Sequence, residues 1–372
     1  MHVPIPTRSS IDWLSQGLLT ETFREKLERM ITSGQQGESK VKDPVANILK
    51  NGELLDQILA DVETDETAGA AELLGAPGVS QVRSAIESVA EGRETTVSPG
   101  LEAIIRRNGR PVLFIHDGAI EEPHLPLWQQ RLAPARAALE RVIPSVGRIE
   151  LRGHPRYNWV GTGWHIAPNV IITNRHVADV FGRQSGSQFV FRLRPDGGEI
   201  KARIDFLEEY QRTEETEFAI REILHIEEDT AGSPDMALLR VAPRDMDDES
   251  DLPAPIPLSD IDAEPDQVVG AVGYAAWDGD RNERELMDEI FQRVYEVKRL
   301  HPGEIMAVQD NFVNHDCSTL GGNSGSAILD FTTGNAVALH YAGRFENQNY
   351  AVKASTIRNK LGELNIDIDA GL

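Results

Sequence analysis

Hydrophobic residues follow two different spacings in the two parts of this chain. Up to about residue 143, apolar positions recur every three or four residues, a spacing that puts them on one face of a helix. In the segment 20–31, Thr20 fits an N-cap, and Phe23, Leu27 and Met30 share one face. The pattern predicts a mostly helical N-terminal region, with helices in the segments 20–31, 43–59, 79–90, 98–107 and 133–143.

From about residue 144 the apolar positions form short runs that Gly, Pro, Asn and Asp separate. Many short strands with turn residues between them are typical of an all-β sandwich or barrel. Two helical segments, 282–300 and 355–364, interrupt this part. The predicted strands cover residues 146–151, 161–168, 169–174, 188–193, 236–242, 267–276, 326–331, 335–343 and 349–354.

A connector joins these two kinds of sequence. Residues 110–118 read as a single strand that ends in an Asp-Gly turn, and residues 120–128 read as an extended segment. We therefore expect three regions. They are a helical N-terminal domain in 1–100, a connector with a short strand and a helix in 101–143, and a β domain in 144–372.

Composition narrows the classes of function. The chain has 372 residues with 60 acidic and 37 basic side chains, and this net charge of −23 is poorly suited to binding nucleic acid. The acids cluster in 208–218 and 245–251, which we expect to be solvated loops. No apolar run approaches the roughly 20 residues of a membrane span, and we expect neither a membrane segment nor a secretory signal. Cys317 is the single cysteine, so no intrachain disulfide can form, which favours a cytoplasmic location.

Three short motifs carry residues suited to nucleophilic catalysis. His176 follows the run 169–174, Asp235 precedes the run 236–242, and Ser324 lies within the stretch GGNSGS. A serine hydroxyl is a weak nucleophile, which needs a base for its proton and N–H donors for the oxyanion that forms. Taken singly, each motif has an ordinary structural explanation: a buried histidine, an aspartate that starts a strand, and a loose Gly-Ser turn.

The order of the motifs TNRHVA, DMALL and GGNSGS, each in a matching strand context, resembles the chymotrypsin-like (trypsin-like) serine peptidases. The resemblance covers about residues 144–372 and is strongest to the bacterial branch that includes the glutamyl endopeptidases. It implies a mainly β fold, in which two six-stranded β-barrels hold a catalytic triad between them and a C-terminal helix follows.

The resemblance also implies a role for each motif. His176 acts as general base and then as acid, Asp235 orients His176, and Ser324 attacks the carbonyl carbon of a protein or peptide substrate. The N–H groups of Gly322 and Ser324 form the oxyanion hole. We expect no cofactor and no metal ion to take part.

The substrate pocket is expected between the segment CSTL and the strand ALHYAG. Ser318 is not acidic, which argues against selection of Lys or Arg before the scissile bond. Thr319 and His340 match residues that receive an acidic side chain in glutamyl endopeptidases, which favours an acidic preference. A small apolar preference is the alternative, and His340 is then a core histidine. The residues expected to contact the substrate side chain or to pair with the substrate backbone are Ser318, Thr319, His340, Tyr341, Ala342 and Gly343.

Asn323 departs from the pattern of the secreted digestive peptidases, where an aspartate pairs with a new N-terminal amine. We therefore expect no switch of that kind. Residues 1–143 are expected to regulate the site by covering it or to recruit a regulatory protein partner, and the strand in 110–118 to pack on the outside of the barrels. Cys317 is expected to be a small buried residue. An inactive binding module of the same fold and an esterase are the alternative functions.

Overall fold

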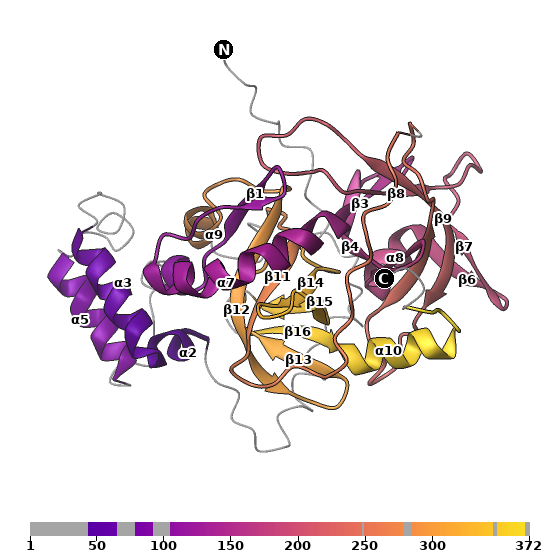
Figure 1. The fold of residues 1–372 in the computed structure, drawn as a ribbon. Helices are drawn as coiled ribbons and strands as arrows, with labels where there is room; N and C mark the ends of the chain where they lie inside the picture. The colour runs from indigo at the N-terminus through magenta and orange to yellow at the C-terminus, as the bar shows by residue number, and fades with distance from the viewer. Residues whose placement is uncertain are drawn as a thin grey trace, which may run out of the picture.

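Two β-barrels and a group of N-terminal helices make up the chain in a computed structural model (Figure 1). The structure describes residues 44–64, 79–91, 105–247, 249–277, 284–344 and 348–368. The helix expected in 20–31 and most of the one expected in 98–107 lie outside the described residues. Within the described residues, no helix is both long and apolar enough to cross a membrane.

Six antiparallel strands close the first barrel in the order β10-β5-β4-β3-β8-β9. They are β3 (Val146–Arg152), β4 (Trp159–Ala167), β5 (Val170–Thr173), β8 (Lys201–Asp205), β9 (Glu217–Ile226) and β10 (Ala237–Val241). A buried apolar cluster that includes Ile149, Phe181, Phe218 and Leu239 belongs to this barrel. The helix α8 (Arg175–Phe181) and the hairpin of β6 (Gly182–Ser185) and β7 (Gln188–Phe191) follow β5.

The second barrel has the strand order β11-β14-β15-β16-β13-β12, and β12 pairs back to β11 to close the ring. Its strands are β11 (Val268–Tyr274), β12 (Lys298–Val308), β13 (Phe312–His315), β14 (Ala327–Asp330), β15 (Ala336–Arg344) and β16 (Gln348–Lys353). The helix α10 (Ala354–Glu363) follows the last strand. Two closed barrels and this helix confirm the predicted fold.

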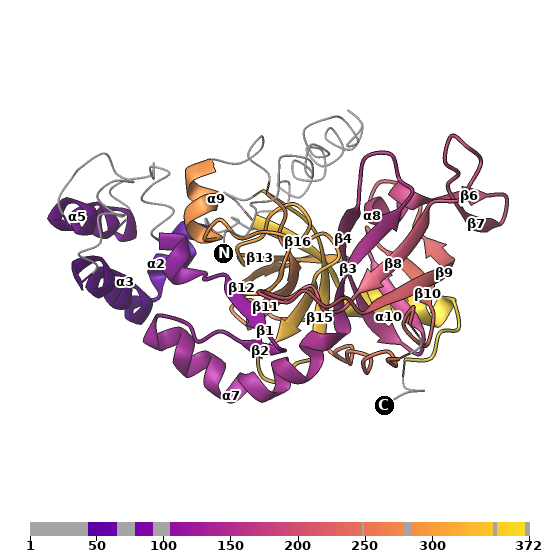
Figure 2. The ribbon, with the colours of Figure 1, turned by 90° about the horizontal axis from the view of Figure 1, so that it is seen from above.

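The N-terminal part is mostly helical where it is described, as the apolar spacing predicted. Its helices are α2 (Pro44–Lys50), α3 (Gly52–Thr64), α5 (Val79–Ala90) and α7 (Pro126–Val142), and the short helix η1 (Ile143–Ser145) leads into the first barrel. In both views α3 and α5 lie beside the second barrel, at the end of the molecule away from the first (Figures 1 and 2). Their side chains share one apolar cluster with the second barrel, which includes Ile48, Ile58, Trp128 and Leu300.

The strand predicted in 110–118 joins the second barrel instead of only packing on its outside. The strand β1 (Leu113–His116) pairs with β12, with Leu113 opposite Leu300, and β2 (Ala119–Ile120) folds back on β1. Since β13 pairs only with the C-terminal part of β12, β1 covers the edge that the N-terminal part of β12 leaves open.

Two predicted segments were wrong in extent. The helix expected in 282–300 is the shorter α9 (Arg284–Ile290), because Gln292, Arg293 and Glu296 adopt left-handed backbone conformations and the chain then enters β12. The segment expected to be extended in 120–128 already begins α7 at Pro126. The acidic segment 208–218 is not simply a solvated loop, since Glu209 and Glu217 are buried.

Candidate active site

His176 and Asp235 lie together at one end of the first barrel. The strand β5 ends at Thr173, and α8 begins with His176 in its first turn. The ring nitrogen Nδ1 of His176 lies 2.7 Å from Oδ2 of Asp235, and the backbone N–H of His176 donates to Oδ1 at 3.1 Å. The side-chain amide of Asn174 donates to the backbone carbonyl of Asp235 at 2.9 Å. Both oxygens of the carboxylate are therefore committed to His176, which fixes the orientation of the imidazole.

The electrostatics of this pair keep Asp235 ionised. Burial by itself raises the pKa of Asp235, but the attraction of His176, its hydrogen bonds and the charge of Arg175 together hold that pKa below its ordinary value. The side chain of Asp235 is 5% exposed and that of His176 is 20% exposed, so the imidazole lies at the edge of the solvent. A neutral imidazole whose Nδ1–H donates to an ionised aspartate presents Nε2 as an acceptor, as a general base must.

The loop around Ser324 has a shape that only glycine allows at two positions. Gly322 and Gly325 have φ of 87° and 92°. A Cβ at Gly325 would come within 1.9 Å of the Thr162 carbonyl oxygen, and one at Gly322 within 2.5 Å of Trp159. The glycines of the stretch GGNSGS thus serve a turn that packs directly on the first barrel.

The N–H groups on either side of Asn323 are left available. The N–H groups of Asn323, Gly325 and Ser326 donate to carbonyl oxygens of neighbouring residues. Among the described residues, the N–H groups of Gly322 and Ser324 have no hydrogen-bond partner. Free N–H groups beside a serine are the donors that an oxyanion requires.

Thr162 of β4 holds the Ser324 loop against the first barrel. Its N–H donates to the Ser324 carbonyl at 2.8 Å, and its hydroxyl donates to the Gly322 carbonyl at 2.9 Å. Its own carbonyl accepts the hydroxyl of Thr173, three residues before His176, at 2.7 Å. A Cβ on Gly161 would lie 2.8 Å from Val177 and 2.9 Å from the Ser324 carbonyl oxygen. The structure therefore brings the serine loop and the start of α8 to the same stretch of β4.

The predicted substrate strand lies next to this loop. The backbone of His340 exchanges two hydrogen bonds with Gly325 and Ser326. The strand β14 pairs with β15 only up to Leu339, so residues 341–343 have no strand partner, among the described strands, on the edge opposite β16. Tyr341 is buried, while Ala342 is half-buried and Gly343 is exposed. This open edge has room for the backbone of an added strand.

The predicted pocket residues come together, with one further residue between them. The hydroxyl of Thr319 donates to Oδ1 of Asn349 at 2.7 Å, and the amide of Asn349 donates to the Cys317 carbonyl at 2.6 Å. Asn349 also lies over Gly343, since a Cβ there would come within 1.9 Å of Oδ1. The sequence did not identify Asn349, because only the register of β15 on β16 places it opposite Gly343.

His340 belongs to a chain of buried histidines. Its Nδ1 lies 3.1 Å from Nε2 of His315, and His301 interacts electrostatically with both. Burial holds the pKa of His340 well below its ordinary value and lowers those of His301 and His315 to about 3. All three imidazoles are therefore neutral in the free protein. The histidines at 301 and 315 carry no motif in the sequence that would have pointed to this arrangement.

Two further predicted residues have structural partners. Ser318 is buried, and its hydroxyl donates to the backbone carbonyl of Arg110 at 2.9 Å. Cys317 is 1% exposed, and burial raises the pKa of its thiol far above the ordinary value. The thiol is thus a protonated core group, as the sequence predicted, and not a nucleophile.

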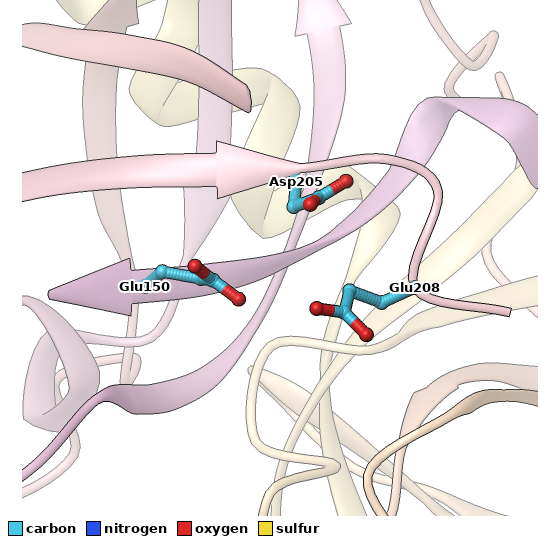
Figure 3. Close-up of side chains that lie close together, drawn as sticks. All are labelled: Glu150, Asp205 and Glu208. Atoms are coloured by element: carbon cyan, nitrogen blue, oxygen red, sulfur yellow. The ribbon is translucent and has the colours of Figure 1, made fainter. Parts of the chain in front are cut away.

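Three carboxylates form the one group in the described residues with metal-ligand spacing. They belong to Glu150, Asp205 and Glu208, whose oxygens lie within 4.8 Å of one another (Figure 3). Arg148 lies in the same group, where it donates to Glu150 at 2.5 Å and also to Glu208. The same guanidinium donates to the carbonyl of Glu296, two residues before β12 of the second barrel, at 3.0 Å. Arg148 therefore supplies one positive charge to this group of acids, and the group forms a charged contact between the barrels.

Two closed six-stranded antiparallel barrels followed by a C-terminal helix are a chymotrypsin-like fold. Residues 161–339 match the family model of the trypsin-like peptidase domain. The match covers slightly less than half of the 372 residues and includes all three motifs. The fold and the match to the trypsin-like peptidase domain support a serine peptidase.

Two solved structures align with this chain at low similarity. A serine endoprotease from Yersinia pestis aligns with a TM-score of 0.40 and 19% identity, over 62% of this chain and 66% of that chain. The protein Rv3671c from M. tuberculosis H37Rv, in an inactive form, aligns with a TM-score of 0.37 and 15% identity, over 61% of this chain and 90% of that chain. These likenesses are too distant to carry an argument about activity. No curated protein sequence matches this chain.

We expect Gly325→Ala to destabilise the protein by about 3 kcal/mol, because it adds a clash with Thr162 to the strain of a left-handed alanine. Gly197→Ala is the matched control, since Gly197 also has a positive φ, of 86°, but has open space around it. The control should lose only about 1 kcal/mol. Denaturant unfolding of both variants measures the difference. Equal losses would show that the loop does not pack on β4 as described.

The buried acids predict a second, pH-dependent effect. Burial and the neighbouring acids outweigh Arg148 and raise the pKa of Glu208 from 4.5 to about 7. A carboxyl with a raised folded pKa binds its proton more tightly in the folded state, so stability is lost as the pH rises from about 4.5 to about 7. Glu208→Gln should stabilise the protein by roughly 1–2 kcal/mol at pH 8 and flatten this slope.

Thermal unfolding between about pH 5 and pH 8 tests this expectation. The control is Glu222→Gln, which removes an exposed carboxylate that pairs with Arg240 on the surface. It should change stability by less than about 1 kcal/mol at every pH. A Glu208→Gln protein with the wild-type slope would contradict the predicted titration.

Proposed function

We propose that the protein is a serine endopeptidase in which His176, Asp235 and Ser324 form the catalytic triad. His176 takes the proton of the Ser324 hydroxyl as it attacks the peptide carbonyl and then gives the proton to the leaving amine. Asp235 holds the imidazole in the required tautomer and stabilises its cationic form. The observation that carries the proposal is the 2.7 Å contact of the buried Asp235 with His176, beside a serine loop with two free N–H groups.

The same loop supplies the donors of the proposed oxyanion hole. The N–H groups of Gly322 and Ser324 are the donors for the negative oxygen of the tetrahedral intermediate, and each such donor is typically worth about 3 kcal/mol of transition-state stabilisation. The substrate backbone adds to the open edge at residues 341–343 as an antiparallel strand. These contacts place the scissile carbonyl next to the nucleophile.

The preferred residue before the scissile bond is acidic in this proposal. The pocket offers His340, Thr319 and the amide of Asn349 as polar groups, and none of them is a carboxylate. His340 is neutral in the free protein, so an incoming carboxylate binds together with a proton that makes the imidazole a charged donor. The buried chain of histidines behind His340 can share that charge.

Regulation through the N-terminal region completes the proposal. The described helices α3 and α5 lie beside the second barrel and away from the first (Figure 2). That position supports regulation by a protein partner that binds these helices, rather than by α3 and α5 covering the triad.

A fluorophosphonate probe tests the triad in the full-length protein. The probe should label wild-type protein and fail to label Ser324→Ala. Asp235→Asn should react about 10⁴-fold more slowly, because the asparagine no longer holds His176 in the tautomer that accepts the serine proton. Mass spectrometry of the labelled peptide identifies the modified residue. No labelling of folded wild-type protein would favour the inactive binding module of the same fold.

The acidic preference predicts a particular pH dependence. A carboxylate in the pocket requires a protonated His340, whose pKa is low in the free protein, so binding takes up a proton and weakens as the pH rises. We therefore expect kcat/KM for a Glu substrate, divided by that for the matched Gln substrate, to rise as the pH falls from about 8 to about 6. The ratio cancels the pH dependence of the catalytic step, which both substrates share.

His340→Gln is the matched variant for this measurement, since it retains a polar side chain that cannot carry the charge. The variant should cleave the Gln substrate and lose the pH dependence of the ratio. A wild-type ratio that stays flat, or that favours Gln throughout, would exclude the acidic pocket and leave the triad proposal intact.

A further inference from the structure

A buried ion pair ties the N-terminal part of the chain to the base of the substrate pocket. Asp316 is fully buried and immediately precedes the pocket segment 317–319. The guanidinium of Arg110 donates to both of its carboxylate oxygens, from Nε and Nη2, at 2.7 Å each. Arg110 itself is 1% exposed. A bidentate pair without access to water fixes both partners in position and in angle.

Other residues of the N-terminal part strengthen this contact. Asn47 of α2 donates to Oδ2 of Asp316 at 3.1 Å. Glu304 of β12 accepts from Arg110 at 3.1 Å and from Arg131 of α7 at 2.8 Å. Three separate segments of the N-terminal part therefore meet two acids of the second barrel.

Trp128 of α7 supports both arginines from one side. The guanidinium of Arg110 lies 5.7 Å and that of Arg131 lies 4.9 Å from the centre of its ring. Its indole N–H donates to the Gly109 carbonyl at 3.1 Å, directly before Arg110. The position of Arg110 is thus set by packing as well as by charge.

The Arg110–Asp316 ion pair adjoins the proposed substrate pocket. Ser318 donates to the carbonyl of Arg110, so the same residue holds the pocket segment by its side chain and by its backbone. A Cβ on Gly303 would lie 2.7 Å from the Cys317 nitrogen and 2.9 Å from Asp316, which shows how closely this segment packs on β12. Four residues beyond Ser318, the chain reaches Gly322 of the nucleophile loop.

The nucleophile loop contains little that would order it from within. Asn323 is fully buried, and its Oδ1 accepts the hydroxyl of Ser326 at 3.2 Å. Within the described residues, its Nδ2 has no partner. An uncharged side chain at this position cannot form a buried ion pair, so the order of the loop depends on its bonds to Thr162 and on the segments that flank it.

We propose that Arg110 is a positioning residue for the peptidase, which holds Asp316 and Ser318 so that the pocket and the oxyanion N–H groups keep their catalytic geometry. The inference rests on the proposed function. It makes the segment around Arg110 a built-in activating element of the second barrel. Loss of this contact lets the segment 316–322 relax, and the activity falls although the triad residues are all present.

The test compares fluorophosphonate labelling and peptide cleavage in full-length variants. Arg110→Ala and Arg110→Lys should both label Ser324 more slowly, by about 100-fold for alanine, because small displacements of catalytic groups are costly in rate. Lysine retains the charge but not the two parallel hydrogen bonds. Arg107→Ala is the control, since Arg107 lies three residues from Arg110 and pairs with Glu289 of α9 at a partly exposed site. The control should label at the wild-type rate.

A double variant separates positioning from stability. Arg110→Met combined with Asp316→Asn removes both charges, so no unpaired charge is left buried. The double variant should unfold at the same temperature as the wild type and still label slowly. In peptide cleavage it should show a lower kcat as well as a higher KM. Wild-type labelling by any folded Arg110 variant would overturn the inference. Absence of labelling in the wild type itself would instead overturn the proposed function.

Discussion

A single buried threonine joins the parts of the site that come from different barrels. Thr162 lies in the middle of β4, and its N–H and hydroxyl bind the carbonyls of Ser324 and Gly322. Its hydroxyl also accepts the N–H of Tyr274 in the second barrel, and its carbonyl accepts the hydroxyl of Thr173. Every polar atom of this residue is therefore used, in a place without water. The relative position of the serine loop and the histidine helix follows from these bonds, so the geometry of the site depends on how the barrels pack.

Buried acidic side chains fix distant segments of the chain relative to one another. The chain carries a net charge of −23, yet several of its acids lie where desolvation opposes their ionisation. Two of these acids have a basic partner from far along the chain: Asp235 and His176 are 59 residues apart, and Asp316 and Arg110 are 206 apart. A buried pair is weak evidence for net stability, but breaking it is costly, so each pair selects one arrangement of two distant segments.

The sequence predicted what short-range patterns encode. Apolar runs with turn residues between them identified most strands, and the motifs around His176, Asp235 and Ser324 pointed to residues that the structure places in one region. It did not predict β8, β9, β12 or β13, whose mixed polar and apolar residues form strands only because neighbouring strands pair with them. Asn349 and Arg110 were also missed, because their importance comes from strand register and from a contact across 206 residues.

The N-terminal part is structurally continuous with the second barrel. As a sequence it reads as a separate helical attachment, but β1 closes an open edge of β12, and the apolar side chains of α2 and α7 continue the apolar cluster of the second barrel. An uncovered strand edge and an exposed apolar face would both be costly for a free barrel. The contact from α2 to the pocket passes through Asn47 and Asp316, which are joined by one hydrogen bond. A partner that shifts the N-terminal helices can therefore act on the pocket through this bond, without reaching the triad.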